Sequence, residues 1–465
     1  MSKFLKWYKG AINKISPYLI IGYFVLTYLP YFVGRFSPLL NFFTSYDIYY
    51  RSLLSILFIG ITLSHYLMSD EKKASPLIVF ILISAYFIVG ALCVPSSITV
   101  RHVFSNSNAI IDVSLQVGFK DLLSGLLNSF FDLYFCFYLI VFGINVIQKK
   151  TIGILLVFTF VASVLEACST FVLDRDSYLS LFSLKFDNVY DLNISGTFQS
   201  KNGLGFLLFQ GVLSTFVLFN YSNKIWQRIL LAVGLSVVMI VSLLSFCKTS
   251  AIISAFCCFA YVISLIFKRK QVYVRRIIFI SIFLFVALAI CLILFIPQLG
   301  SMKGVGGIIP SIRNTILERL QIWYEATYLM KVPQLFIGYS KGVSNYLLHL
   351  VDENLSSYYF HNGFVTIMVN YGLIGLILYI LLVVYIFKKA KYLDESWKSV
   401  YLLVFCASIA YTCFEAYHLF LSGSPVVMLQ SILLVYLPIL YSTKNERRVA
   451  LYDAFIQEDF YSISI

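Results

Sequence analysis

Charged residues are scarce in this chain of 465 residues, of which only 12% are Asp, Glu, Lys or Arg while 60% are hydrophobic. The mean hydropathy is accordingly high, at +0.86. Soluble globular domains carry about 25% charged residues, so this composition excludes a soluble globular enzyme. It predicts a protein that crosses a membrane many times.

Metal-binding, redox and repeat signatures are also lacking. The nine cysteines include no C-x-x-C pair and lie mostly in apolar runs, so we interpret them as small hydrophobic side chains. No group of carboxylates or histidines has the spacing of metal ligands, and we therefore predict no metal and no cofactor. The first apolar stretch is long and has no small-residue cleavage site, so we expect it to remain as a span rather than act as a signal peptide.

Long apolar runs recur along the chain. Each span needs about 20 apolar residues. We predict an all-α polytopic membrane protein with about twelve transmembrane helices, at residues 17–34, 48–68, 76–95, 123–147, 151–173, 202–220, 227–246, 250–267, 276–297, 362–387, 399–421 and 425–441.

The basic residues are distributed unequally between the loops on the two sides of these spans. Most of the 35 lysines and arginines fall in the two termini and in the short loops on the same side. The positive-inside rule therefore places both termini in the cytoplasm of a cell bounded by this membrane. We interpret the net charge of +13 as a topology signal, and we expect no nucleic-acid partner.

The predicted transmembrane domain comprises residues 1–441, and residues 442–465 form a cytoplasmic tail. Within the domain, a large extracytoplasmic loop at 298–361 separates spans nine and ten, and loops of this length are usually functional. Residues 311–330 of this loop show helical spacing, which predicts an amphipathic helix across the outer surface. Its apolar stripe is expected at Ile312, Ile316, Leu320, Trp323 and Met330, with Pro310 near its start and Pro333 beyond its end.

Polar clusters open three spans that run from the outside inward. Lys201 and Asn202 begin the sixth, Lys248 begins the eighth, and His361 with Asn362 begins the tenth. A helix N-terminus beside a cation binds anions, so three of them on one face predict a diphosphate site. The alternative is that these residues are ordinary helix caps and interfacial anchors.

Two arginines lie on the predicted outer helix. Arg319 and Trp323 are four positions apart and share a face, with the arginine suited to phosphate and the tryptophan to stacking on sugar rings. Arg313 lies six positions before Arg319, so the two need not point at one site. For both, a surface helix with snorkelling basic side chains is the alternative.

Carboxylates inside predicted spans are costly and usually face a polar cavity. Glu166 and Glu415 lie in the outer halves of their spans and could border one cavity, with His418 on the same helix face as Glu415. A structural carboxyl that is protonated or hydrogen-bonded internally is the alternative, and it is favoured for Asp132.

Several motifs from span six to span ten resemble the O-antigen ligase and polymerase superfamily of integral-membrane glycosyl-transferring enzymes. The resemblance covers about residues 195–380, and the matching segments are His361-Asn362, nine residues, Gly372-Leu-Ile-Gly375; Gly196-Thr-Phe with Lys201-Asn202-Gly203; Arg319-x-x-x-Trp323-x-x-Ala326; and Pro333 to Gly338. Lys248 departs from the family, which often has an arginine there and with it a fork that lysine cannot form.

The resemblance implies a GT-C-like glycosyltransferase in the bacterial plasma membrane. It implies metal-independent, inverting transfer from an undecaprenyl-diphosphate-linked oligosaccharide at the outer face, with cations holding the diphosphate and His361 beside the acceptor hydroxyl. Implied partners are the lipid-linked donor and acceptor, the bilayer, and a chain-length regulator and flippase of the same pathway.

The sequence leaves three functions open. A polysaccharide polymerase is favoured by the resemblance at residues 196–205. An O-antigen ligase, which transfers to lipid A core, shares the motif. A flippase or transporter would share the composition, although it is expected to have paired halves, and no internal repeat is visible here.

Overall fold

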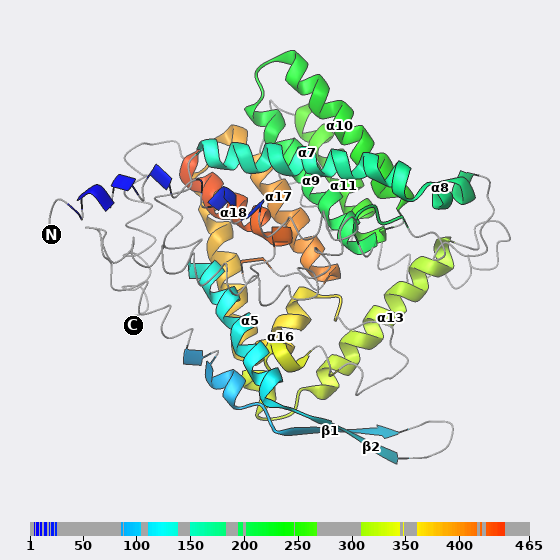
Figure 1. The fold of residues 1–465 in the computed structure, drawn as a ribbon, viewed down its shortest axis with the longest axis vertical. Coiled ribbons are helices and arrows are strands. Elements are labelled where there is room, and N and C mark those ends of the chain that lie inside the picture. The colour runs from blue at the N-terminus through cyan, green and yellow to red at the C-terminus, as the bar shows by residue number, and fades with distance from the viewer. Residues whose placement is uncertain are drawn as a thin grey trace.

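Helices make up most of the residues that the computed structural model describes. It describes residues 85–103 except 87, 110–137, 149–182, 194–198, 201–245, 247–266, 308–344, 347, 360–415, 419–420 and 425–441, with scattered residues between 4 and 25. The helices are α5 (Phe119–Phe137), α7 (Lys149–Leu173), α8 (Arg175–Phe182), α9 (Lys201–Tyr221), α10 (Ile225–Leu244), α11 (Lys248–Ile266), α13 (Ile308–Leu329), α14 (Gln334–Ile337), α16 (Gly363–Lys388), η4 (Lys389–Tyr392), α17 (Glu395–Phe414) and α18 (Pro425–Leu440). Figure 1 shows α7, α9, α10 and α11 side by side, with α13 set apart from them.

Among the described residues, five helical stretches are long and apolar enough to cross a membrane, and they fall in α7, α9, α10, α16 with η4, and α17. The shorter apolar stretches Lys248–Ser264 and Val427–Pro438 lie in α11 and α18. The protein is therefore a mostly helical membrane protein. Twelve spans remain a prediction, because the expected spans at 48–68 and 276–297 lie outside the described residues and those at 17–34, 76–95, 123–147 and 399–421 lie only partly inside them.

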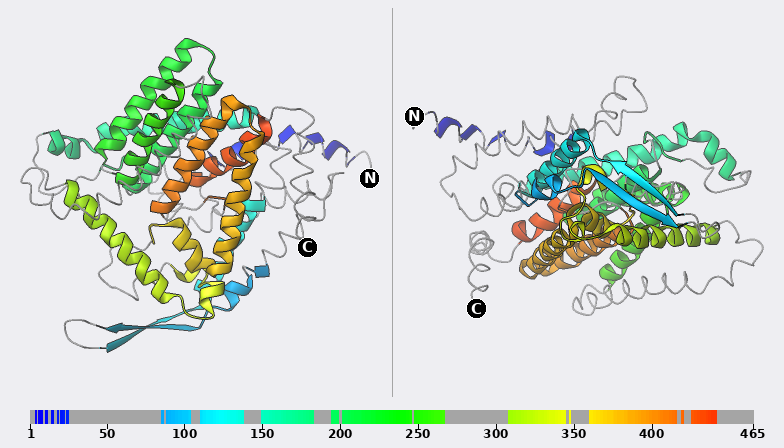
Figure 2. Two further views of the ribbon diagram at one scale, coloured as in Figure 1. Left: turned by 180° about the vertical axis from the view of Figure 1, so that it is seen from behind. Right: turned by 90° about the horizontal axis from the view of Figure 1, so that it is seen from below.

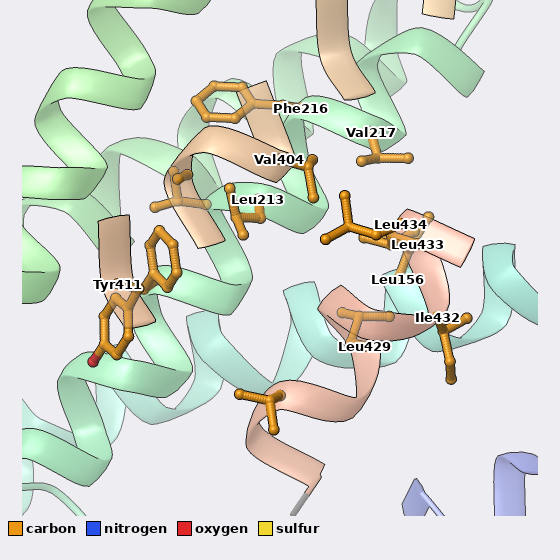
Figure 3. Close-up of a cluster of buried hydrophobic side chains, with 14 of the residues drawn as sticks. Leu156, Leu213, Phe216, Val217, Val404, Tyr411, Leu429, Ile432, Leu433 and Leu434 are labelled. Carbon is orange, nitrogen blue, oxygen red and sulfur yellow. The ribbon is translucent and has the colours of Figure 1, made fainter. Parts of the chain in front are cut away.

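Helix α9 occupies the centre of the core. Nearly all of its residues from Leu204 to Leu218 are buried, and its packing against α7 is the most extensive between helices of the described chain. Two small residues allow this close approach: a Cβ on Gly211 would lie 2.1 Å from Oγ of Ser163 on α7. Figure 3 shows side chains of α7, α9, α17 and α18 meeting in this core, including Leu213 and Phe216.

One face of α10 is exposed, in contrast to the buried α9. Trp226, Ile229, Leu230 and Val233 are 57%, 59%, 58% and 58% exposed. An apolar surface of this kind on a helix long enough to span a bilayer faces lipid rather than water.

A β-hairpin interrupts the helical pattern between α5 and the preceding helical residues. Strands β1 (Ser97–Val103) and β2 (Ile110–Gln116) pair antiparallel, with Ile98 opposite Leu115. Figure 2 shows the hairpin projecting from the other described elements. The all-helical prediction missed it, although β-branched residues recur here with the two-residue period of a strand. Ile98, 6% exposed, belongs to the hydrophobic cluster around α13 and anchors the base of the hairpin.

Helix α13 confirms the helix predicted at 311–330, and its buried face differs in part from the expected stripe. Ile322, Ala326 and Leu329 are buried, whereas Leu320 is 46% exposed. Positions 319, 322, 326 and 329 repeat at three and four residues, so the buried face also includes Arg319. Of the expected stripe, Met330 is buried and Trp323 partly buried, so Leu320 is the member that departs among the described side chains.

Helix α16 is broken at Gly372, where φ is 67° and ψ is −174°. The turn around α14 fills the break: the amides of Tyr339 and Ser340 donate to the carbonyls of Val369 and Asn370 at 2.8 and 3.0 Å. A Cβ on Gly372 would lie 2.1 Å from the carbonyl oxygen of Phe336, so the backbones meet too closely for any side chain.

The hydroxyl of Tyr86 donates to the carbonyl of Tyr371 next to the break and lies 3.2 Å from that of Phe336. Gly338 likewise adopts a positive φ of 79° against α16. The Pro333 to Gly338 turn and the glycine half of the His361 motif therefore form one packed unit.

Candidate functional site

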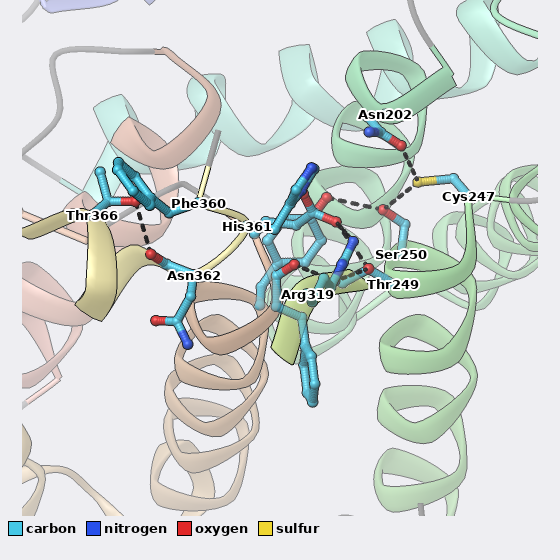
Figure 4. A network of polar contacts seen from close by, with 12 residues as sticks. Asn202, Cys247, Thr249, Ser250, Arg319, Phe360, His361, Asn362 and Thr366 are labelled. Atoms are coloured by element: carbon cyan, nitrogen blue, oxygen red, sulfur yellow. Dashed lines mark hydrogen bonds and ion pairs between the residues drawn. The ribbon is translucent and has the colours of Figure 1, made fainter. Parts of the chain in front are cut away.

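Thr249 in the first turn of α11, Arg319 of α13 and His361 before α16 converge on Glu415, which directly follows α17 (Figure 4). Oε1 of Glu415 accepts a hydrogen bond from Oγ1 of Thr249 at 2.9 Å and forms an ion pair with Nη2 of Arg319 at 3.0 Å. The other oxygen, Oε2, lies 3.4 Å from Nδ1 of His361. The two residues predicted to carry the chemistry, Arg319 and His361, are thus joined through one carboxylate.

The Arg319 side chain makes further contacts at the end of α17. Its Nη1 donates to the backbone carbonyl of Phe414, and Oγ1 of Thr249 lies 3.5 Å away. The last carbonyls of a helix have no partner within the helix and carry partial negative charge, so they attract a cation. The Arg319 and Glu415 side chains are only 13% and 7% exposed, so solvent screens their attraction little.

Glu415 is ionised at neutral pH. Burial raises the pKa of its carboxyl, but the hydrogen bond with His361 and the charge of Arg319 outweigh burial, and the pKa lies below its ordinary value. The site therefore contains a charged carboxylate rather than a neutral acid.

His361 has a backbone conformation that is unusual for its residue type. Its φ of 48° lies in the left-handed region, which costs a residue with a side chain about 1 to 2 kcal/mol. Such outliers persist only where surrounding contacts hold them and they cluster at functional sites.

Two predicted substrate-binding residues hold the backbone around His361. Oδ1 of Asn362 accepts from the amides of Phe364 and Val365 at 2.9 and 3.1 Å, which makes Asn362 the N-cap of α16. Nε1 of Trp323 donates to the carbonyl of Phe360 at 2.8 Å and ties α13 to the residue before His361. Contacts of Asn362 and Trp323 with a substrate remain predictions.

The starts of α9 and α11 are held together beside this cluster. Sγ of Cys247 lies 3.8 Å from Oδ1 of Asn202, and Oγ of Ser250 lies 3.1 Å from the hydroxyl of Tyr411 (Figure 4). A Cβ on Gly205 would lie 2.2 Å from Sγ of Cys247, so this glycine is needed for the approach. Two of the three predicted helix N-termini are therefore adjacent.

The predicted cations Lys201 and Lys248 are the first residues of α9 and α11, and both are partly exposed. Neighbouring Cys247 is buried, and burial raises the pKa of its thiol to about 11. It is therefore a neutral thiol at physiological pH and lacks the thiolate needed of a nucleophile.

Glu166 contacts a different segment. Its Oε1 accepts from the Thr197 hydroxyl at 2.9 Å and from the Thr197 amide at 2.5 Å. Gly196, with a φ of 60°, passes so close that a Cβ would lie 2.3 Å from this oxygen. The Gly196-Thr-Phe segment is thus shaped by Glu166, which matches the alternative of an internally hydrogen-bonded carboxyl.

Sequence reasoning missed Asp174 and Tyr86. Oδ2 of Asp174 accepts from the amides of Ser195 and Gly196 at 3.0 and 2.6 Å. The signal for Asp174 was its place directly after a long apolar run, next to a glycine-containing loop. Nothing in the sequence indicated that Tyr86 would contact a helix more than 250 residues away.

Several predicted residues lie beyond what the structure describes. Tyr358 and Tyr359, which lie just before His361 in the sequence and are expected to suit stacking on sugar rings, fall outside the described residues, as does His418. Arg313 lies in α13 with no description of its side chain. Within the described chain, no group of three or more His, Cys, Asp or Glu side chains is arranged to hold a metal ion.

The geometry defines a class of site: a buried carboxylate between an arginine and a histidine, close to helix ends, in a mostly helical membrane protein. No protein-family model matches the chain, and no curated protein is similar to it in sequence.

Proposed function

We propose that this protein is a polysaccharide polymerase. It transfers a growing glycan from undecaprenyl diphosphate onto another lipid-linked repeat unit at the outer face of the bacterial plasma membrane, with inversion and without a metal. The observation that carries the proposal is the convergence of Arg319 and His361 on Glu415.

Arg319 supplies the cation that the leaving group requires. A guanidinium has five N–H donors, and phosphate oxygens fit its planar fork. The N-termini of α9 and α11, which begin with Lys201 and Lys248, add positive charge beside it. These cations act in the transition state, because negative charge grows on the diphosphate as it leaves.

His361 supplies the base. The acceptor hydroxyl oxygen attacks the anomeric carbon of the donor, and the bond from that carbon to the diphosphate oxygen breaks. The electron pair leaves with undecaprenyl diphosphate, and the hydroxyl proton passes to the imidazole. General base catalysis of this kind contributes about 10² to 10⁴ in rate.

A polymerase needs two similar lipid-linked substrates, one held by its diphosphate and one by its sugar. Arg319 with Lys201 and Lys248 suits the diphosphate of the first substrate. Trp323, and the tyrosines that precede His361 in the sequence, suit stacking on the sugar of the second. A ligase would instead have to bind a lipid A core with several phosphates, for which the sequence offers no second basic patch on the outer loops.

Purified protein given only undecaprenyl-diphosphate repeat units should produce a ladder of multiples. Arg319→Ala should abolish the ladder or reduce it strongly, and Arg319→Lys should restore part of it, since charge returns without the fork. A matched control is Arg228→Ala, because Arg228 donates to the Ser222 carbonyl at the opposite end of α9 and should keep full activity.

Three outcomes would overturn the proposal. A single product that forms only when lipid A core is added would establish the ligase. Movement of lipid-linked substrate across vesicles without transfer would establish a transporter. Loss of the ladder on chelation, reversed by one specific divalent ion, would contradict metal independence.

A further inference from the structure

The two oxygens of Glu415 have different kinds of partner. Oε1 receives hydrogen bonds from Arg319 and Thr249, at 3.0 and 2.9 Å, while Oε2 faces only the ring of His361 among the contacts of the described residues. The two segments are also joined by the hydrogen bond from Trp323 of α13 to the backbone carbonyl of Phe360, but that bond involves neither the Arg319 nor the His361 side chain. Glu415 therefore contacts both side chains, with a different oxygen for each.

The contact with His361 has a consequence for its tautomer. An ionised carboxylate can only accept hydrogen bonds, so the contact is a hydrogen bond only when Nδ1 of His361 carries the hydrogen. In a neutral imidazole the lone pair then resides on Nε2. The carboxylate thereby selects which ring nitrogen can accept a proton.

We infer that Glu415 is a positioning residue that holds His361 with its hydrogen on Nδ1, so that Nε2 receives the acceptor proton, while its second oxygen holds Arg319 for the diphosphate. This role rests on the proposed function where it concerns substrates. The effect on the tautomer stands on the geometry alone.

Glu415→Gln is the informative substitution, because it keeps the shape and removes one acceptor. A guanidinium can only donate, so the amide oxygen must face Arg319 and the amide NH₂ must face His361. Nδ1 then has to accept, and the ring hydrogen moves to Nε2. A base held in the wrong tautomer loses up to about 10⁴ in turnover, and the loss expected here is about 10² to 10⁴, which is what the base contributes.

Donor binding should respond differently. The amide oxygen still orients Arg319, and removal of a negative charge beside it does not weaken attraction for an anion. The affinity of the Glu415→Gln variant for undecaprenyl-diphosphate-linked donor should therefore be unchanged or higher. A purely structural role of Glu415 predicts the reverse, because a displaced arginine would weaken donor binding.

Two further variants serve as controls. Glu415→Asp retains a carboxylate and should keep more turnover than Glu415→Gln. Thr249→Val removes the hydrogen bond that Oε1 of Glu415 accepts but leaves unchanged the oxygen that faces His361. It should therefore reduce turnover less than Glu415→Gln does. Equal losses in all three variants would overturn the inference.

The tautomer can be measured without any activity. In protein labelled with ¹⁵N-histidine and studied in bilayers at about pH 8, the signals of His361 are those that His361→Ala removes from the five histidines. The wild type should show a protonated Nδ1 and an unprotonated Nε2, and Glu415→Gln should show the reverse.

The two experiments separate the two proposals. If the tautomer switches but wild-type protein makes no ladder, the proposed function fails and the positioning role of Glu415 stands. If the ladder forms but the tautomer does not switch, or the glutamine variant keeps wild-type turnover, the positioning role fails and the polymerase stands.

Discussion

The ion pair between Arg319 and Glu415 predicts a specific pattern of stability in a double-mutant cycle. Arg319→Met keeps the length and bulk of the side chain but leaves the 7% exposed Glu415 carboxylate without its cation. Removal of one partner of a buried pair costs about 3 to 5 kcal/mol. His361, whose Nδ1 lies 3.4 Å from the same carboxylate, can offset part of this, so we expect the lower end of that range.

Replacement of both partners should cost far less. In the double variant Arg319→Met with Glu415→Gln no uncompensated charge is buried, and the Thr249 hydroxyl still has an amide oxygen to donate to. Exchange of a buried pair for neutral groups of similar volume is often close to neutral. The coupling between the two positions should therefore be at least about 2 kcal/mol.

The pH dependence follows from the direction of the Glu415 pKa. Because the folded-state pKa is lowered, the pair contributes stability above the ordinary carboxyl value of about 4.3 and loses it as pH falls through the lower folded-state value. The deficit of Arg319→Met should thus be full at neutral pH and shrink in acid. The test is the free energy of unfolding of each variant, measured by detergent titration at neutral pH and in acid. If the effects of the two single substitutions simply add up in the double variant, the ion pair as described is refuted.

Three further predictions concern other parts of the chain. Gly372→Ala should destabilise the protein by more than about 2 kcal/mol, measured by the same titration, because a Cβ would lie 2.1 Å from the Phe336 carbonyl oxygen in a left-handed conformation. Asp174→Ala should remove the hydrogen bonds that two buried loop amides donate, at a cost of about 1 to 3 kcal/mol each, and make that loop more sensitive to proteolysis. In a cysteine-free background, an impermeant thiol reagent added to intact cells should label a cysteine at Ser301 and spare one at Thr443, whereas the reverse pattern would contradict the predicted topology.

The helices that the sequence predicted well are those with long apolar runs. The expected spans at 202–220, 227–246 and 362–387 correspond to α9, α10 and α16 within a few residues. Each run ends at polar or basic residues, so composition alone limits its length. In the long loop before α16, the helical spacing of apolar residues predicted α13. It did not fully predict which side of α13 is buried, because it included the exposed Leu320.

The contacts of the site could not be predicted in the same way. The sequence suggested Glu166 and Glu415 as neighbours of one cavity, because both occupy outer halves of apolar runs. In the structure each serves a different segment, Thr197 for Glu166 and Arg319 with His361 for Glu415. Which carboxylate receives which partner depends on how α7, α13 and α17 pack, and local patterns carry no information on that packing.

The hairpin shows a further limit. The predicted spans at 76–95 and 123–147 leave residues 96–122 as a connection, and the β-branched residues Ile98, Val100 and Val113 lie within it. Their alternation with polar residues is the only local sign of strands, and it extends over just 7 residues in each.

The break in α16 at Gly372 separates a largely buried first half of the helix from a second half that has an exposed apolar side. All of the strongly exposed apolar residues of α16, among them Ile377 at 49% and Leu381 at 59%, come after Gly372, whereas the part before it is buried or half-buried. The half after the break has one side toward lipid and the other, with Tyr379, Val383 and Ile386, buried in the core, so a change of bilayer thickness acts on this half rather than on the turn that follows His361. We expect turnover to stay constant in vesicles of different acyl-chain length, because the packed turn at Gly372 stands between the lipid-facing residues and His361.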